Sequence, residues 1–256
     1  MEESIMNTVR LDKFLADAGV GTRSEVKKQI QKGLVQVNEA VIKDSGYKVT
    51  LPQDRVSVRG QRVGVSEEFE YYLLHKPAGC VSATTDNLHK TVLDYLPKSR
   101  KELFPVGRLD KDTEGLLLIT NDGELAHQLL SPKKHVDKTY FARVAGKVTD
   151  DDVQAMEQGV DIGEKKVTLP AKLVILKTEE TADGWVSEVE LTICEGKFHQ
   201  VKRMMEAVGK KVTYLKRISM GPLALPKDLE KGQYRKLTQE EVDKLKKSGK
   251  RQHNSL

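Results

Sequence analysis

Apolar residues near the start of the chain recur with the period of an α-helix. A first helix is predicted over residues 10–19, and the apolar side chains that share its face are Leu11, Phe14, Leu15 and Ala18. Gly19 marks its end, because glycine readily adopts the backbone conformation that terminates helices. Thr22 and Glu25 have the spacing of a capping box, in which each side chain caps the backbone N–H of the other residue. They predict a second helix that begins after Thr22 and ends at Gly33.

Short strands follow these two helices. Residues 34–37 and 40–42 flank a two-residue turn and predict a hairpin, and residues 56–58 predict a further strand. Two helices followed by short strands indicate a small independent module over residues 9–62. The composition then turns polar, so we expect a short linker over residues 61–68.

Beyond this linker, short apolar runs typical of strands alternate irregularly with helical segments. The strand-like runs are residues 71–74, 116–119, 140–144, 173–176 and 185–193, and the helical segments are 124–130, 149–157 and 199–208. An irregular mixture of this kind favours an α+β fold over a regular parallel α/β fold. We expect this second domain to cover residues 69–240. The basic residues 241–256 lack an apolar face and are expected to form a disordered tail.

The composition is that of a highly charged globular protein, with 38% hydrophobic and 32% charged residues. No apolar run approaches the roughly 18 residues that would span a membrane, and the first seven residues do not resemble a secretory signal. Cys80 and Cys194 lie far apart and outside any CxxC pair, which argues against a disulfide framework or a zinc site. We therefore expect a cytoplasmic protein. Its net charge of +5 favours nucleic acid as a partner only where the charge clusters.

Residues 106–115 place the carboxylate of Asp110 in a polar loop flanked by glycines. A loop beside a strand can hold an acid rigidly with its side chain free to react. Most aspartates beside glycine turns only shape the loop, however, so Asp110 alone is a weak candidate. Arg108 lies two positions earlier and would project to the same side in extended backbone.

Two later segments carry further candidates. Tyr140 opens a predicted strand, where a tyrosine ring most often packs in the core. In the helix predicted over residues 199–208, the inward stripe consists of Val201, Met204, Met205 and Val208. Lys202 lies at the edge of that stripe, and a cation at the border of a buried face needs a carboxylate partner. Arg203 points to the opposite side and is expected to contact phosphate or solvent.

Residues 107–116 fit the pattern Gly-Arg-Leu-Asp-x-x-Thr-x-Gly-Leu at every named position, and a motif of this length is specific. It resembles the signature of ribosomal RNA pseudouridine synthases of the RsuA type, and the resemblance extends from about Val9 to Leu237. The short motifs Lys-Thr-Tyr and His-Gln-Val-Lys-Arg-Met favour the small-subunit branch of that family. The N-terminal module resembles the RNA-binding domain named after ribosomal protein S4. The resemblance implies a catalytic domain with a mixed, mainly antiparallel sheet flanked by helices.

The resemblance also implies roles for individual residues. Asp110 matches the catalytic aspartate, Tyr140 matches a tyrosine that stacks on the target base and helps to move the proton at C5, and Lys202 matches the cation paired with the aspartate. Lys76 belongs to a Lys-Pro-x-Gly turn near the RNA groove, and His75 stands where these enzymes often have asparagine. The other residues expected to bind RNA are Arg108, Arg203, Lys13, Arg23, Lys27, Lys28 and Lys32.

Pseudouridine formation exchanges the N1–C1′ bond of uridine for a C5–C1′ bond, with no redox change and no consumption of water. The resemblance therefore implies neither a cofactor nor a metal. The expected partner is ribosomal RNA or an assembling small ribosomal subunit, with no membrane partner, and the expected state is a monomer. Asp110 would act as a nucleophile at C1′ or as a base toward the C2′–H, and the sequence leaves both routes open.

Three alternatives to this interpretation stay open at this point. An enzyme of the same family could modify large-subunit RNA. A non-catalytic RNA-binding factor in ribosome assembly would keep the basic module but would not need Asp110 and Lys202. A glycoside hydrolase would pair Asp110 with Glu114 or Asp122 at about 5–9.5 Å across a sugar, but aromatic residues, which line sugar grooves, make up only 5% of the chain.

Overall fold

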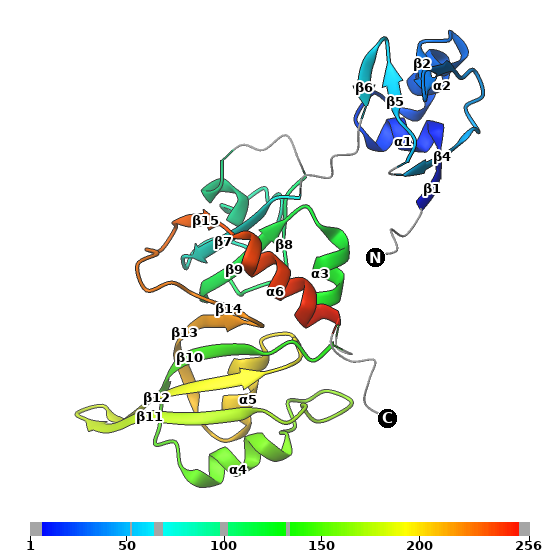
Figure 1. The fold of residues 1–256 in the computed structure, drawn as a ribbon. Helices are drawn as coiled ribbons and strands as arrows, with labels where there is room; N and C mark the ends of the chain where they lie inside the picture. Colours follow the sequence, from blue (N-terminus) through cyan, green and yellow to red (C-terminus); the bar gives the residue numbers. More distant parts are fainter. Residues whose placement is uncertain (1–6, 52, 64–68, 98–101, 132–133, 251–256) are drawn as a thin grey trace. The chain divides into compact units, whose positions relative to one another are not determined.

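The structure is a computed structural model that describes residues 7–51, 53–63, 69–97, 102–131 and 134–250. The chain divides into two compact units, Met1–Glu68 and Phe69–Leu256. Figure 1 shows the elements of each unit. No helix among the described residues is both long enough and apolar enough to cross a membrane.

The first unit contains two helices and short strands, as the sequence predicts. Its elements are β1 (Asn7–Arg10), α1 (Leu11–Asp17), α2 (Arg23–Gln31), β2 (Val35–Val37), β3 (Ala40–Val41), β4 (Lys48–Leu51), β5 (Val56–Val58) and β6 (Gln61–Val63). The capping box at the start of α2 is present, because Thr22 accepts from the N–H of Glu25 and Glu25 accepts from the N–H of Thr22. The core lies between the helices and the sheet β3-β2-β5-β6 and includes Leu11, Val26 and Ile30, which are fully buried.

The predicted linker over residues 61–68 is wrong in its first three positions. Gln61–Val63 form β6, which pairs with β5 in antiparallel register. Val63 packs against the core of the first unit, whereas Gln61 and Arg62 are exposed, so this mostly polar segment forms the edge strand of the sheet. Residues 64–68 lie outside the described residues.

The second unit is built on one nine-stranded sheet, in which β11-β12-β10-β13-β9-β7-β15 are neighbours. Its strands are β7 (Tyr71–Lys76), β8 (Phe104–Pro105), β9 (Glu114–Thr120), β10 (Lys138–Ala145), β11 (Lys172–Thr181), β12 (Gly184–Ile193), β13 (Lys211–Met220), β14 (Leu223–Ala224) and β15 (Tyr234–Lys236). Its helices are η1 (Val92–Tyr95, a 3₁₀ helix), α3 (Gly123–Leu130), α4 (Asp150–Gln158), α5 (Gln200–Ala207) and α6 (Gln239–Lys250). β13 and β9 run parallel and the other pairs are antiparallel, so the α+β class and the mixed sheet are confirmed.

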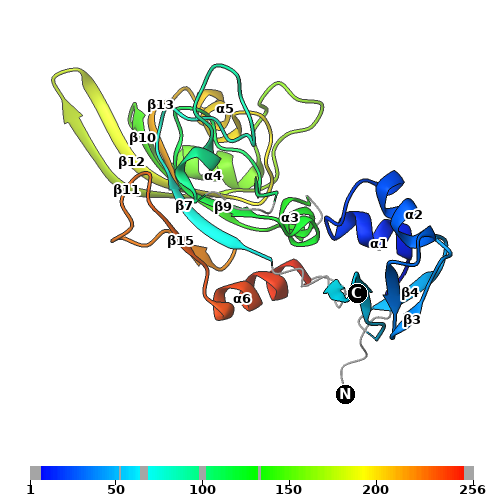
Figure 2. The same ribbon diagram turned by 90° about the horizontal axis from the view of Figure 1, so that it is seen from above.

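Helices pack on both faces of this sheet, and β9 shows why. Leu117 and Ile119 belong to the core that includes residues of α4 and α5, whereas Leu116 and Leu118 belong to the core that includes residues of α3 and α6. All four side chains are fully buried. A strand covered on both faces needs apolar residues at every position, which explains the unbroken apolar run. Figure 2 shows α4 and α5 on one side of the sheet and α6 on the other.

The predicted disordered tail is wrong for residues 241–250, which belong to α6. Val242 and Leu245 are three positions apart and are buried, so this helix has a short apolar stripe among its charged residues. Glu241 accepts two hydrogen bonds from the guanidinium of Arg235, at 2.8 and 2.6 Å, which ties α6 to β15. Residues 251–256 lie outside the described residues.

Candidate active site

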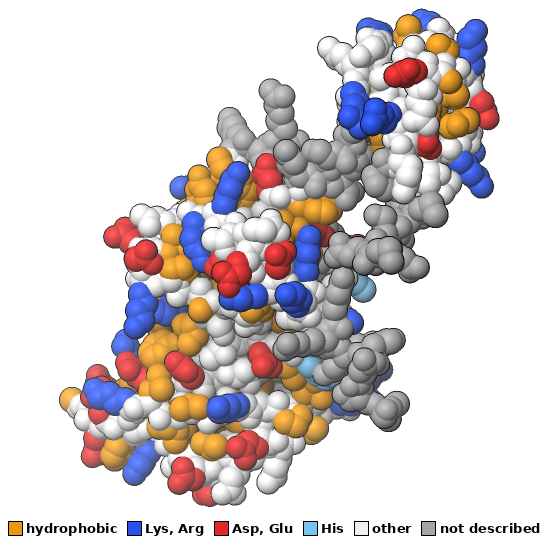
Figure 3. All heavy atoms as spheres, viewed as in Figure 1, with side chains coloured by type: hydrophobic (Ala, Val, Ile, Leu, Met, Phe, Trp, Pro, Cys, Tyr) orange, Lys and Arg blue, Asp and Glu red, His pale blue; other side chains and the backbone are white. Residues whose placement is uncertain are grey.

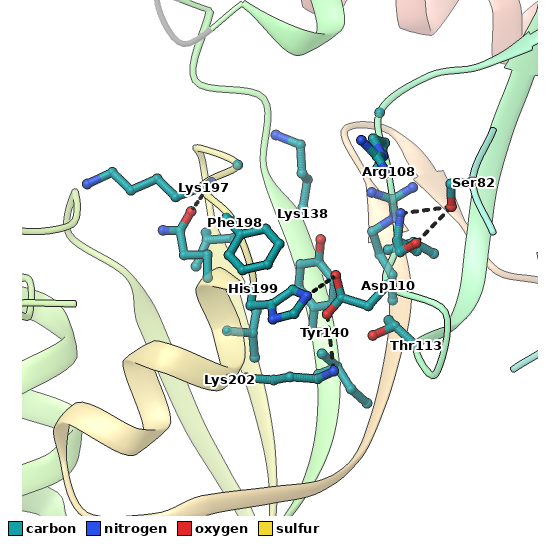
Figure 4. Close-up of a pocket in the computed structure, with 18 of the residues that line it drawn as sticks. Ser82, Arg108, Asp110, Thr113, Lys138, Tyr140, Lys197, Phe198, His199 and Lys202 are labelled. Carbon is teal, nitrogen blue, oxygen red and sulfur yellow. Dashed lines mark hydrogen bonds and ion pairs between the residues drawn. The ribbon is translucent and has the colours of Figure 1, made fainter. Parts of the chain in front are cut away.

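A cavity of about 650 Å³ opens in the second unit beside the loop that carries Asp110. Its walls come from residues 107–113, from β10 and β13, and from residues 195–202 at the start of α5. Figure 4 shows Asp110, His199, Tyr140 and Lys202 facing the same space, although they come from distant parts of the chain.

Contacts from β7 and the segment after it hold the Asp110 loop. Ser82 donates its hydroxyl to the carbonyl of Leu109 at 2.8 Å and accepts from the N–H of Leu109 at 3.0 Å. The side chain of Asp110 keeps 26% of its surface exposed, toward the cavity. A carboxylate on such a fixed backbone is oriented without being sealed from substrate.

Lys76 is the main support of this loop, and the prediction that it binds RNA is wrong. It is fully buried, because β7 packs against β9 and carries the side chain under the loop. Its ammonium donates to the carbonyls of Thr113 at 2.8 Å, Asp110 at 3.0 Å and Pro77 at 3.1 Å. Burial lowers the pKa of Lys76. The lysine therefore acts inside the protein and presents no charge to a ligand.

Lys202 pairs with Asp110, as helix geometry and the family resemblance both predict. Its ammonium lies 3.1 Å from Asp110 Oδ2 and 2.7 Å from Asp112 Oδ1, so two carboxylates share one cation. Burial opposes the charge on Lys202, but the hydrogen bonds with Asp112 and Asp110 outweigh it and raise the pKa of the lysine. The hydrogen bond from Lys202 likewise lowers the pKa of Asp112. The sequence did not single out Asp112.

His199 and Phe198 also reach the cavity, and the sequence analysis assigned no role to either. His199 Nε2 lies 3.5 Å from Asp110 Oδ1, on a residue with a positive φ of 48° just before α5. The ring of Phe198 stacks on His199 with 3.8 Å between centroids, and Phe198 is 72% exposed. The exposed face of this ring pair borders the cavity, where a flat ligand could stack on it, and the adjacent aromatic pair was the signal available in the sequence.

The structure confirms the core position of Tyr140, and stacking on a base stays a prediction. Tyr140 is 8% exposed and belongs to the core, yet it also lines the cavity. Directly opposite it on β13 lies Arg217, whose Nε donates to the carbonyl of Leu116 at 2.8 Å. The close approach of β13 to β9 explains why the motif needs Gly115, because a Cβ there would lie 2.2 Å from the carbonyl oxygen of Arg217.

The remaining lysines and arginines that we expect to bind RNA differ in their exposure and in their contacts within the protein. Arg108 is exposed at the cavity. The guanidinium of Arg203 bonds Glu164 and the carbonyls of Phe198 and Ile162, and its side chain is 25% exposed, so its contact with RNA stays a prediction. Arg203 ties the start of α5 to a loop that the sequence could not place beside it. In the first unit, every residue predicted to bind RNA is exposed: Lys13, Arg23, Lys27, Lys28 and Lys32. Figure 3 shows Lys and Arg side chains at the surface of that unit.

The carboxylates that a glycoside hydrolase would need are occupied elsewhere. Glu114 is buried and accepts from Tyr214 at 2.6 Å and from Lys231 at 3.0 Å. Asp122 is buried and caps α3 by accepting from the N–H of Leu125 at 2.9 Å. Neither can face Asp110 across a sugar. Within the described ranges, no group of three or more His, Cys, Asp or Glu residues could hold a metal ion.

Comparison with known proteins finds a matching family model in each of the two units. Residues 70–207 match the family model of RNA pseudouridylate synthase, and residues 9–56 match the S4 domain. The chain is 47% identical to an RNA pseudouridine synthase of Bacillus subtilis, YtzG, which is described as uncharacterized, over 93% of this chain and 98% of that one. It is 40% identical to ribosomal small subunit pseudouridine synthase A of Haemophilus influenzae, over 93% of this chain and all of that one.

Two further similarities complete the comparison. The chain is 42% identical to ribosomal large subunit pseudouridine synthase B of Bacillus subtilis, over 93% of this chain and 95% of that one. A crystal structure of a pseudouridylate synthase superimposes with a TM-score of 0.63 at 38% identity, over 93% of this chain and 99% of that one.

Proposed function

This chain belongs to the RNA pseudouridylate synthase family, and we propose that it converts one uridine of small-subunit (16S) ribosomal RNA into pseudouridine through Asp110. The observation that carries this proposal is the ion pair between Lys202 and Asp110 at the wall of a cavity large enough for a nucleotide. A non-catalytic RNA-binding factor would have no need of a partly exposed carboxylate held in this way.

The contacts around Asp110 suit the reaction. Asp110 attacks C1′ or takes the C2′ proton through its carboxylate, and the ammonium of Lys202 holds that carboxylate at 3.1 Å. Ser82 and Lys76 fix the backbone of the loop, so that little reorganisation is needed when the substrate arrives. Both routes use the same carboxylate in the same place.

The uridine must leave its base stack to reach Asp110, which costs a few kcal/mol. Stacking of the base on Tyr140 would return about 1–3 kcal/mol. Arg108, exposed at the cavity, is suited to fill the space left by the base or to hold the flipped phosphate. The exposed lysines and arginines of the first unit would add phosphate contacts, so binding should weaken as salt is raised.

The choice of the small subunit rests on the sequence motifs and on the named relatives. The relative from Haemophilus influenzae is a small-subunit enzyme, whereas one from Bacillus subtilis is a large-subunit enzyme at similar identity. The motifs at Tyr140 and Lys202 favour the small-subunit branch. A substrate in ribosomal RNA implies action in the cytoplasm.

Pseudouridine mapping of ribosomal RNA at single-nucleotide resolution tests this proposal. Cells lacking the protein would be compared with cells complemented by the wild type or by Asp110→Asn. We expect one small-subunit site to be lost and then restored only by the wild type. Loss at a large-subunit site would overturn the choice of subunit, and an unchanged map would overturn ribosomal RNA as the substrate.

A further inference from the structure

Two buried cations lie together on the strands that form one wall of the cavity. Lys138 on β10 is 7% exposed and Arg217 on β13 is 2% exposed. Arg217 is the register partner of Tyr140, and Lys138 lies two positions before Tyr140 on the same face of β10. Both line the cavity, next to the ring on which the target base is proposed to stack.

The protein provides these cations with few partners. The ammonium of Lys138 donates to the carbonyl of Val136 at 3.0 Å, and Nε of Arg217 donates to the carbonyl of Leu116. Nη2 of Arg217 is buried and finds no hydrogen-bond partner among the described residues. Within that part of the chain, no carboxylate forms an ion pair with either cation.

A buried charge without a counterion is unfavourable. The pKa of Lys138 reflects this unfavourable environment. Burial and the charge of Arg217 lower the pKa of Lys138, while Cys194, Asp137 and Glu195 act in the opposite direction. The cavity as a whole is strongly cationic, since only Asp110 and Glu195 are acidic among its lining residues. The lysines and arginines that line it are Arg108, Lys111, Lys138, Lys197, Lys202 and Arg217.

We infer that Arg217 and Lys138 supply the positive charge that balances the uracil anion released when the glycosidic bond breaks. This inference rests on the proposed function of Asp110. When the N1–C1′ bond breaks by either route, its electron pair leaves with the base, so detached uracil carries a negative charge shared by N1, O2 and O4. C5 then bonds to C1′. In the nucleophilic route the Asp110–C1′ bond breaks at this step, and in the other route Asp110 returns the proton to C2′. The C5 proton leaves and N1 takes up a proton, so no atom is gained or lost.

The position of the pair also suits the rotation of the base. A half-turn about the N3–C6 axis exchanges N1 with C5 and O2 with O4, so one carbonyl oxygen replaces the other at the same place. A base that binds with one carbonyl toward the pair would therefore present an anionic oxygen to these cations before and after the turn. Preorganised charge of this kind stabilises a developing anion without rearrangement of the protein.

Single-turnover kinetics on an RNA fragment carrying the target uridine, or 5-fluorouridine in its place, tests this inference. Fluorine stabilises the uracil anion, so loss of the cations should matter less for the fluorinated base. We expect Arg217→Gln to slow conversion of uridine by about 100-fold, Lys138→Met to slow it less, and both losses to fall below about tenfold for consumption of 5-fluorouridine. The affinity for RNA should stay within about twofold of the wild type.

Lys216→Met is the matched control, because it removes a cation from the same strand on the side that faces Phe141. Equal losses with both bases would overturn the inference, as would weaker RNA binding with a reduced salt dependence, which would indicate a phosphate contact. If Arg217→Gln does not fold, the same comparison of uridine with 5-fluorouridine is made on Lys138→Met and Arg217→Lys. A wild type that makes no pseudouridine contradicts the proposed function itself, whereas an active wild type with unaffected variants contradicts only this inference.

Discussion

Replacement of Lys76 by methionine tests whether this lysine supports the Asp110 loop or binds RNA. Methionine keeps the length of the side chain but removes the ammonium and its hydrogen bonds to the carbonyls of Asp110 and Thr113. The carbonyl of Asp110 keeps a partner in the N–H of Thr113. The carbonyl of Lys111, which Lys76 contacts at 3.4 Å, keeps one in the N–H of Gly79. The carbonyl of Thr113 loses the ammonium inside the protein.

The magnitude follows from these contacts. A buried carbonyl left without its partner costs about 1–3 kcal/mol, and charge-assisted bonds to the neighbouring carbonyls add to that loss. Removal of the buried charge offsets part of it, because burial already lowers the pKa of Lys76. We expect Lys76→Met to lower the free energy of unfolding by about 2–4 kcal/mol, which a domain stable by about 5–15 kcal/mol survives in folded form.

Urea unfolding followed by tryptophan fluorescence measures this change in the correct unit, because the single tryptophan is Trp185 on β12. Conversion of the target uridine should fall as well, since the loop that holds Asp110 loses its support. Lys165→Met is the control, because this lysine of the same unit is exposed and does not line the cavity. Unchanged stability together with weaker RNA binding in Lys76→Met would refute the structural role and restore the RNA contact.

Three further substitutions test other contacts. Glu241→Gln removes the charged contact between α6 and Arg235. The pKa of Glu241 is lowered to about 2 in the folded protein, so the native carboxylate stabilises the fold above pH 4.5. This stabilisation is lost as the pH falls toward 2. The stability difference of about 1–3 kcal/mol from wild type at neutral pH should therefore shrink over that range in urea titrations. In Asp112→Asn, the pKa of Lys202 should fall, so the alkaline limb of the rate–pH profile should move to lower pH, and an unmoved limb would show that Lys202 does not set it. Phe198→Ala should weaken RNA binding by about 1–3 kcal/mol without changing stability, as fluorescence anisotropy and thermal unfolding can show.

The sequence predicts those parts of the structure that depend on local geometry. The capping box at Thr22 is a contact between residues three positions apart, and it starts α2 as expected. The placement of Lys202 follows from the angular spacing of residues along α5, which fixes its side chain at the border of the core. The long motif around Asp110 needed no tertiary information to be found.

The remaining parts depend on contacts between distant segments, which spacing along the chain does not contain. Lys76 is buried because β7 pairs with β9, about 40 positions later in the chain. Arg203 is occupied by a loop near Glu164, and α6 is stable because Val242 and Leu245 find a surface to cover. The shared use of Lys202 by a second carboxylate likewise appears only in three dimensions.

The most direct test of the central claim is the conversion of uridine to pseudouridine by purified Asp110→Asn protein on the mapped ribosomal RNA. Asparagine keeps the shape of the side chain but can neither attack C1′ nor accept a proton from C2′. We predict no pseudouridine above background, RNA affinity within about twofold of wild type, and full activity of the exposed control Asp183→Asn. Conversion by Asp110→Asn at the wild-type rate would contradict the account.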